Sequence, residues 1–553
     1  MKNLIILTSY YLILLLSIIG FGFFLSKILK FELKTNEIAL YGILGIIFLT
    51  FISYFTNIFF PHNFTHNLII HSIGILLFLY YRIAKTFIYK KINYLIIFFL
   101  ISFFLLHLLS KTHDDFGWYH LPYTLNLSQN KFQFGLGHFN HGFRTPSSLF
   151  YLNSIFYLPG IKFYSFNFAQ LYIFLFSIVF FYQKIFIDIK KSSLIKFYSL
   201  LSLIFILVIF YRLAEHGTDR SGQILLFIII VFILEILIEK NLNLKKISLV
   251  LILFVFVVTL KSYFIIFGLL LIPIIFHINK NLLVYKKIIF SNTVFFSLFF
   301  LLLHFSVQLA NSGCFFYPIN FSCYNGFVWS FPEKEILHLS QWYELWAKSG
   351  ANPNWRVENP SEYVSNFNWV KNWFSSYFFN KVSDFILGIL TILIISFLFI
   401  YKKSKKKKEK NKIGFFLLSI IIIFIIWFFK FPQLRYGGYV IIANLFFLPF
   451  CHFILKNKIN KKVINYLKIL TIIGLVIFAG RNVNRIINEA KIYNYNPIQN
   501  AYFRLENIKF KTIILGKDIN FNISDGSCWA TPQPCTHRRG INATKKYNYI
   551  IYF

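Results

Sequence analysis

Long apolar runs recur along the chain and are separated by polar connections. Many of these runs approach the roughly 20 residues that an α-helix needs to cross a bilayer. We therefore predict an all-α integral membrane protein with about 14 transmembrane helices. The predicted spans are approximately 4–26, 37–60, 67–81, 92–110, 166–182, 195–211, 222–238, 247–260, 262–278, 288–309, 382–401, 413–429, 437–455 and 463–480.

Two of these predictions have alternatives. The stretch 247–278 has basic flanks on both sides, so the chain should return to the same side of the membrane. Two short helices broken near Lys261 satisfy this condition, whereas one long tilted helix would invert the topology of everything before it. We expect two helices. For the first run the alternative is a signal peptide, although the run is long and no clear small-residue cleavage site follows it.

Positive charge is concentrated on every second connection. Lys and Arg number 56 in the chain, and 29 of them lie in the connections 27–36, 81–91, 183–196, 239–246, 279–287, 402–412 and 456–462. This alternation follows the positive-inside rule and assigns these connections to the cytoplasm. The net charge of +36 would suggest nucleic-acid binding in a soluble protein, but here it belongs to cytoplasmic loops. We expect no nucleic-acid partner.

The opposite face of the membrane receives the long polar insertions. They are the outer loops 111–165, 212–221 and 310–381 and the C-terminal segment 481–553. We predict a polytopic transmembrane domain, 1–480, followed by an extracytoplasmic tail, 481–553. Thr512 to Leu515 and Tyr549 to Phe553 have the pattern of short strands, so a small α/β cap is expected in the tail.

Four of the five cysteines form two close pairs on this outer face. Cys314 and Cys323 share one loop, Cys528 and Cys535 share the tail, and Cys451 lies in a predicted span. Close pairs in an oxidising compartment suit disulfide bonds. No Cys-x-x-Cys spacing is present, which argues against a structural zinc site.

Two adjacent carboxylates, Asp114 and Asp115, open the first outer loop. Desolvated carboxylates are costly unless they meet water, a metal or a cation. One carboxylate there can take the proton of an attacking hydroxyl. Two together can hold Mg²⁺ or Mn²⁺. An ordinary solvated turn is the alternative, but the density of histidine, aspartate and arginine in this loop favours a catalytic site.

Further polar side chains map to the same side. The substrate-binding candidates are His113, His120, His138, His141, Arg144, Glu215, Asp219, Arg220, Lys261 and Arg435. The spacing of the histidines follows no helical ligand pattern, so we expect hydrogen bonds to substrate or to the aspartate pair rather than a transition-metal site. The arginines and the lysine either snorkel or bind phosphate.

The loop 310–381 contains six of the nine tryptophans, Trp329, Trp342, Trp346, Trp355, Trp369 and Trp373. Indole rings favour the membrane interface, so interfacial anchoring is the first interpretation. The same rings also stack on sugars. A platform for a glycan or a lipid headgroup is therefore the alternative.

Several segments of the outer face resemble an uncharacterised bacterial family of polytopic membrane proteins, the LIC-type family. They are Asp115 to Pro122 (DFGWYHLP), Gly135 to Phe150 (GLGHFNHGFRTPSSLF), Asn311 to Pro318 (NSGCFFYP) and Cys528 to Thr536 (CWATPQPCT). A paired acid in an early outer loop also resembles the GT-C superfamily of glycosyltransferases, which use polyprenyl-phosphate-linked sugars. In that superfamily the acids usually follow the first span, whereas here they follow the fourth predicted one.

This resemblance implies a GT-C-like, membrane-embedded enzyme of cell-envelope polysaccharide biosynthesis in the bacterial inner membrane. It would transfer a sugar from a polyprenyl-phosphate-linked donor to an envelope glycan or lipid. Asp115, helped by Asp114, would be the base or would hold Mg²⁺ or Mn²⁺; Arg144, Arg220, Lys261 and Arg435 would hold the donor phosphate. The alternatives are an O-antigen-type polymerase or ligase, and a non-enzymatic transporter of lipid-linked sugars.

Overall fold

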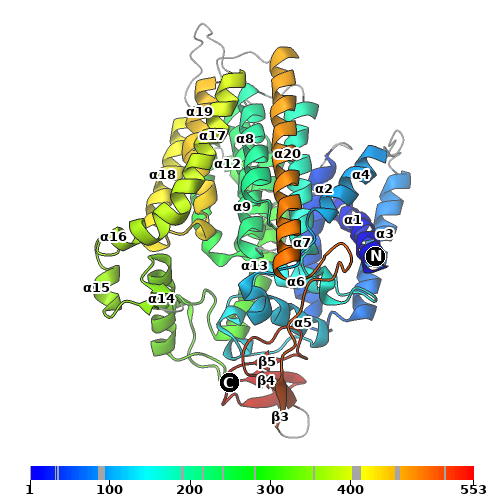
Figure 1. Ribbon diagram of the computed structural model, residues 1–553, viewed down its shortest axis with the longest axis vertical. Helices are drawn as coiled ribbons and strands as arrows, with labels where there is room; N and C mark the ends of the chain where they lie inside the picture. Colours follow the sequence, from blue (N-terminus) through cyan, green and yellow to red (C-terminus); the bar gives the residue numbers. More distant parts are fainter. Residues whose placement is uncertain are drawn as a thin grey trace.

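The computed structural model describes residues 2–31, 33, 37–84, 94–188, 192–213, 217–239, 242–278, 282–352, 355–400, 413–454, 461–515 and 519–553. Within these ranges the chain is mainly helical, and a small strand-containing region lies at one end of the helical body (Figure 1). The basic run 402–412 and most of the connection 456–462 lie outside the described residues, as do Glu215 and most of 85–93.

The helices follow one another with short connections. Those before residue 270 are α1 (Lys2–Ile28), α2 (Ile38–Asn57), α3 (Phe64–Ala84), α4 (Tyr94–Leu105), α5 (Leu121–Gln129), α6 (Ser148–Ser154), α7 (Phe168–Tyr182), α8 (Ser193–Ile209), α9 (Thr218–Ile238) and α10 (Leu244–Leu260). The later ones are α11 (Ile272–His277), α12 (Leu282–Ile289), α13 (Asn292–Ser312), α14 (Glu333–Ala347), α15 (Pro360–Val364), α16 (Val370–Trp373), α17 (Ser383–Ile400), α18 (Ile413–Lys430), α19 (Gly438–Ile454) and α20 (Lys461–Ile492).

Eight helical segments in the described ranges are long and apolar enough to cross a membrane. They are Lys2–Ile28, Ile38–Asn57, Phe64–Ile83, Phe163–Ile187, Thr218–Ile238, Asn292–Ser312, Val370–Ile400 and Lys461–Ile492. The molecule is therefore a helical membrane protein. The remaining predicted spans also fall on helices, but shorter ones: α8 and α19 have 17 residues each. At 1.5 Å per residue such a helix is about 25 Å long, less than the roughly 30 Å of the hydrocarbon core.

The stretch 247–278 is divided as expected. Helix α10 ends at Leu260, and Lys261 adopts an extended conformation, with φ −156° and ψ 114°. A 3-10 helical segment, Ser262–Leu271, then leads into α11, which has a proline at its start. Because Lys261 is extended, the helical axis is interrupted at this residue and its side chain lies beside other polar groups.

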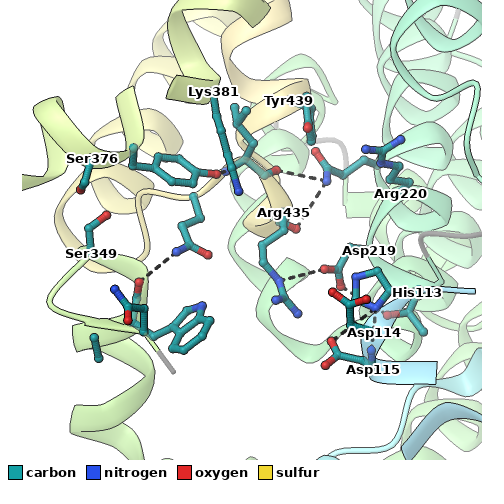
Figure 2. Close-up of a pocket in the computed structure, with 18 of the residues that line it drawn as sticks. His113, Asp114, Asp115, Asp219, Arg220, Ser349, Ser376, Lys381, Arg435 and Tyr439 are labelled. Atoms are coloured by element: carbon teal, nitrogen blue, oxygen red, sulfur yellow. Dashed lines mark hydrogen bonds and ion pairs between the residues drawn. The ribbon is translucent and has the colours of Figure 1, made fainter. Parts of the chain in front are cut away.

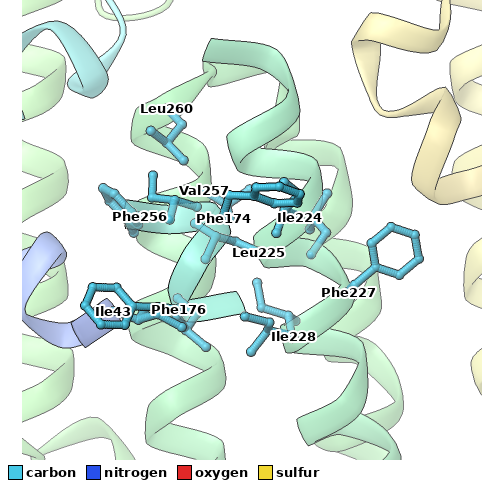
Figure 3. Packing of buried hydrophobic residues seen from close by; sticks show 14 of the residues in the cluster. Ile43, Phe174, Phe176, Ile224, Leu225, Phe227, Ile228, Phe256, Val257 and Leu260 are labelled. Carbon is cyan, nitrogen blue, oxygen red and sulfur yellow. The ribbon is translucent and has the colours of Figure 1, made fainter. Parts of the chain in front are cut away.

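The core of the helical body is built on α9, which is buried along nearly its whole apolar stretch. A helix that is hydrophobic on all sides belongs in the interior. Figure 3 shows Phe174 and Phe176 of α7, Ile224 and Leu225 of α9 and Phe256 of α10 packed in this cluster. Helices α1 and α2 approach more closely, because a Cβ at Gly22 would lie only 1.7 Å from the carbonyl oxygen of Tyr41.

The tail contains two small sheets. Strands β3 (Phe510–Leu515) and β4 (Ile519–Ser524) pair antiparallel, and β5 (Cys535–Thr536) joins β4 in parallel. Strands β6 (Ala543–Lys546) and β7 (Tyr549–Tyr552) form a hairpin. Both segments that were predicted as strands therefore lie in strands, while residues 481–492 continue α20 without a break.

The tail packs against the first outer loop. The amide of Tyr552 donates to the carbonyl of Phe134 at 3.0 Å, and the Thr536 hydroxyl donates to the carbonyl of Phe139 at 2.8 Å. A disulfide joins Cys528 to Cys535 within the tail. A second disulfide joins Cys314 to Cys323 in loop 310–381, which also carries a two-residue hairpin of β1 (Ala351–Asn352) and β2 (Trp355–Arg356). Cys451 is a buried free thiol.

Candidate functional site

A cavity of about 860 Å³ lies where four segments that are distant in sequence meet (Figure 2). One is the turn 113–120 of the first outer loop, and the second is the first turn of α9. The other two are the region 346–381 and the segment 433–439. The polar residues in its lining are His113, Asp114, Asp115, Tyr119, His120, Thr218, Asp219, Arg220, Gln223, Ser349, Asn352, Asn372, Ser376, Tyr377, Lys381, Gln433, Arg435 and Tyr439.

Asp219 is the electrostatic centre of one wall. Its Oδ1 lies 2.6 Å from Lys261 Nζ and its Oδ2 lies 3.1 Å from Arg435 Nε. Gly217, with φ +63°, turns the chain immediately before α9 and brings Asp219 to the cavity. One carboxylate thus faces two cations, so this wall keeps an excess of positive charge.

Burial has opposite consequences for these two cations. Desolvation lowers the pKa of Lys261 to about 8, although the neighbouring Asp219 carboxylate opposes this shift. The Asp219 carboxylate raises the pKa of Arg435 further above its usual value. Lys261 Nζ also lies 4.4 Å from the centre of the Tyr436 ring, a cation–π contact. Near neutral pH both groups are therefore cationic, and Lys261 is the one that loses its charge first as the pH rises.

The chain that carries Arg435 is held from several sides. The indole N–H groups of Trp373 and Trp427 donate to the carbonyls of Pro432 and Gln433, at 2.8 and 2.9 Å. Gln223 Nε2 of α9 donates to the carbonyls of Leu434 and Arg435, at 3.3 and 3.4 Å. Each bond satisfies a carbonyl that no helix satisfies. The position of the Arg435 guanidinium is consequently fixed by the surrounding helices.

The two adjacent aspartates have different surroundings. Asp115 Oδ2 accepts a hydrogen bond from the Tyr119 hydroxyl at 3.0 Å, and the Asp115 amide donates to His113 Nδ1 at 3.1 Å. Asp114 is 85% exposed, and its Oδ1 lies 3.3 Å from Lys111 Nζ. Asp115 is therefore oriented by the turn on which it lies, whereas Asp114 extends into solvent (Figure 2).

These partners also test the aspartate pair as a metal site. The two carboxylates are held by different neighbours, Tyr119 for Asp115 and Lys111 for Asp114. Within the described part of the chain, no group of three or more His, Cys, Asp or Glu side chains gathers around one point. The arrangement therefore favours separate roles for the two aspartates over a shared Mg²⁺ or Mn²⁺.

Two aromatic side chains complete the wall beside Asp115. Burial lowers the pKa of His120 to about 4, so its ring is neutral at neutral pH. Burial and the nearby Asp115 carboxylate raise the pKa of Tyr119 well above its usual value, so the phenol keeps its proton. Both groups consequently act as neutral hydrogen-bonding partners.

The remaining predicted residues lie elsewhere. Arg144 is buried, and its guanidinium donates to the Tyr317 hydroxyl and to Glu335 Oε1, both at 2.5 Å. It thereby ties the first outer loop to loop 310–381 and does not line the cavity. His138 and His141 do not line it either, and His138 Nε2 lies 3.0 Å from the carbonyl oxygen of Trp329. Lys261 contacts the cavity through Asp219.

Several cavity residues were not found from the sequence. Lys381 directly precedes a predicted span, where lysine is ordinarily an interfacial anchor. Gln223 lies inside the predicted span 222–238, and a polar side chain in an apolar run was a usable signal. Asn372 and Ser376 carry no such signal. The tryptophan loop does contribute, through Trp346 and Trp355.

Comparison with known proteins gives a family but no activity. Neither a curated protein nor a solved structure matches the chain. One family model, described as a domain of unknown function (DUF8201), matches residues 4–442. This stretch includes nearly all of the helical body and every residue that lines the cavity. The chain belongs to the DUF8201 family.

Proposed function

We propose that the protein is a membrane-embedded, GT-C-like glycosyltransferase that acts at the extracytoplasmic face of a bacterial inner membrane. It transfers a sugar from a polyprenyl-phosphate-linked donor to a cell-envelope glycan or lipid. One observation supports this proposal above the others. The cavity combines an oriented carboxylate, Asp115, with Arg435, Arg220 and Lys381, and the further cation Lys261 lies directly behind Asp219.

The cationic wall suits the phosphate of the donor. When the bond between the sugar and the phosphate breaks, negative charge grows on the phosphate that leaves. Arginine and lysine that are already in place stabilise such charge, and arginine can do so with two parallel hydrogen bonds. Arg435 keeps 42% of its side-chain surface accessible although it is paired with Asp219, so it can also reach a ligand.

Asp115 suits the proton transfer. In the proposed reaction an acceptor hydroxyl oxygen forms a bond to the anomeric carbon while the bond from that carbon to the phosphate oxygen breaks. The hydroxyl proton passes to the Asp115 carboxylate, and the bonding electron pair leaves with the phosphate. The hydrogen bond from Tyr119 fixes one carboxylate oxygen, which orients the other for this task.

The acceptor side of the cavity suits a sugar or a lipid headgroup. Trp346 and Trp355 line it together with the amide of Asn372 and the hydroxyl of Ser376. Trp355 is 48% exposed. An accessible indole face beside amide and hydroxyl groups matches the alternating apolar and polar surface of a sugar ring.

Sugar transfer by the purified full-length protein from synthetic polyprenyl-phosphate sugars tests the proposal. Asp115→Asn should lower kcat by about 10² or more, because the base is lost. Asp114→Asn is the matched control and should retain most activity, because Asp114 is largely exposed. Full activity in both variants would reject the proposal. Activity that persists after chelation of divalent ions would remove the metal role alone.

A second arm separates the polymerase or ligase alternative. That class uses a pyrophosphate-linked donor and depends more on arginine and histidine than on a carboxylate. Transfer from a pyrophosphate-linked donor, none from a monophosphate-linked donor, and activity in Asp115→Asn would together identify that class. The His113 and His120 rings, stacked 6.1 Å apart at the cavity edge, are then the residues to substitute next.

A further inference from the structure

A second cavity, of about 500 Å³, lies beside the first and has a different character. It is lined by one face of the C-terminal part of α20, by residues 211–212 and by Lys111. The ion pair between Lys111 and Asp114, a residue of the first cavity, shows that both cavities are at the same end of the helical body.

Positive charge exceeds negative charge in this second cavity. Its lining contains Lys111, Arg212, Arg481 and Arg485 but a single carboxylate, Glu489. Glu489 receives Arg212 at 3.1 Å and Arg485 at 3.1 Å, so its charge is shared between two arginines. Like charges around one cavity repel each other, and a bound anion relieves that repulsion.

The arginines are held in place rather than loosely attached. Arg485 is buried, and its guanidinium donates to the carbonyls of Leu106 and Leu108, each at 3.0 Å. Arg481 is exposed; it donates to the carbonyl of Val208 at 2.6 Å and stacks 3.9 Å from the Tyr211 ring. An arginine that is fixed by a stacked ring and one hydrogen bond can offer its remaining N–H groups to a phosphate.

The level of the cavity along α20 indicates where the anion comes from. On the opposite side of the same helix, Val483 and Ile487 are 47% and 48% exposed, and they continue an exposed apolar stripe from Ile472 and Val476. An exposed apolar stripe on a spanning helix faces lipid. Residues 481–489 therefore lie near the boundary of the bilayer, at the depth of the lipid phosphates.

We propose that this cavity is a binding site for the phosphate group of an anionic membrane lipid, separate from the candidate active site. The site does not depend on the glycosyltransferase proposal, because none of its lining residues belongs to the proposed catalytic machinery. Arg481 and Lys111 contact the phosphate, Arg485 and Arg212 supply the field, and Asn484 offers an amide donor from the same face of α20.

The test measures the thermal unfolding midpoint of the full-length protein in neutral detergent during titration with short-chain phosphatidylglycerol. We expect a saturable increase in the midpoint, no increase with phosphatidylcholine of the same chain length, and little with inorganic phosphate. Arg481→Gln should weaken the phosphatidylglycerol effect about tenfold, because one charge-assisted contact is lost. Lys491→Gln removes one charge from the same helix outside the cavity and should bind as the wild type does.

Three results would overturn the proposal. They are an equal response to phosphatidylcholine, an equal response to inorganic phosphate, and unchanged lipid affinity in Arg481→Gln. Asn484→Asp serves as a second variant if Arg481→Gln is poorly folded. It is nearly isosteric, exposed, and adds a negative charge to the cavity. It should also weaken binding, and wild-type affinity in this variant would equally reject the site.

Discussion

At the residue scale, neighbouring side chains of one chemical type have been given different tasks by their surroundings. Asp114 and Asp115 are adjacent in sequence, yet only Asp115 receives a hydrogen bond from a buried phenol. In the same way Asp219 is fully engaged by two cations, which makes it an organiser of positive charge rather than a base. Asp115 is the one acid among these three that combines orientation with an accessible oxygen.

The hydrogen bond from Tyr119 to Asp115 gives the first prediction. Tyr119→Phe removes only the hydroxyl, so Asp115 loses its fixed orientation while the packing of the ring remains. A hydrogen bond to a charged group is worth about 1.5–3 kcal/mol, and we expect kcat to fall about tenfold with KM little changed. Tyr547→Phe, at an 85% exposed position in the tail, is the matched control. Wild-type kcat in Tyr119→Phe would remove its role in positioning Asp115.

Lys261 gives a prediction about pH. Its pKa is lowered to about 8, mainly by burial, so the side chain is cationic below pH 8 and becomes neutral as the pH rises through this value. Binding of the donor phosphate should weaken accordingly. The ratio kcat/KM, which reports the free enzyme, is expected to decline above about pH 8. Lys261→Arg keeps its charge to much higher pH and should move the decline upward.

The control for this experiment is Lys545→Arg, a conservative change at an exposed position of the tail. It should leave the pH profile unchanged. A decline that stays at the same pH in Lys261→Arg would show that another group controls it.

The sequence identified many, but not all, of these residues. Asp115, Asp219, Arg220 and Arg435 stood out because charged groups at the ends of apolar runs need a reason. The same argument also selected Arg144, which the structure buries between two loops with an acid and a phenol as partners. A sequence shows that an arginine lies near a membrane boundary, but its partner 191 residues away is set by the fold.

At the scale of elements, the turn that carries Asp115 and Tyr119 depends on the tail. Gly117, in the π-helical turn Phe116–His120, accepts a hydrogen bond from the Trp529 amide at 2.9 Å. A Cβ at Gly117 would lie 2.4 Å from the Trp529 indole. Only glycine allows this approach, so the tail acts as a support behind the catalytic turn.

Gly117→Ala should therefore disturb both elements. A methyl group forced against a rigid, packed indole costs about 1–3 kcal/mol, so the thermal unfolding midpoint should fall and Asp115-dependent activity should fall with it. Gly526→Ala is the control, because a Cβ at Gly526 meets no atom within 4 Å. Equal midpoints for the two variants would show that the tail and the turn are not coupled in this way.

The positions of the helices followed from the apolar runs, but their exact lengths did not. Helix α10 stops at Leu260, where the chain turns Lys261 toward Asp219, and α20 continues through the polar residues 481–492. In α20 the polar residues remain helical because Arg485 and Glu489, four residues apart, pair on one face. Polarity marks where a helix leaves lipid, whereas tertiary contacts decide where it ends.

At the scale of the whole molecule, both cavities lie at the end of the helical body near the strand-containing tail. The lysine-rich connections belong, by the charge rule, to the opposite side. This separation is what allows a lipid-linked sugar to be used away from cytosolic nucleotides. The orientation of the chain is therefore the condition on which the proposed reaction depends.

Cysteine labelling of intact cells tests that orientation. Asp114→Cys lies at an 85% exposed position beside the first cavity and should react with a membrane-impermeant maleimide without permeabilisation. Lys406→Cys, in the basic run 402–412, should react only after the membrane is opened. Background reaction should be low, because four native cysteines are in disulfides and Cys451 is buried. If both positions react from the same side, the catalytic turn and the lysine run share a compartment, and a reaction that takes its donor from the outer leaflet is ruled out.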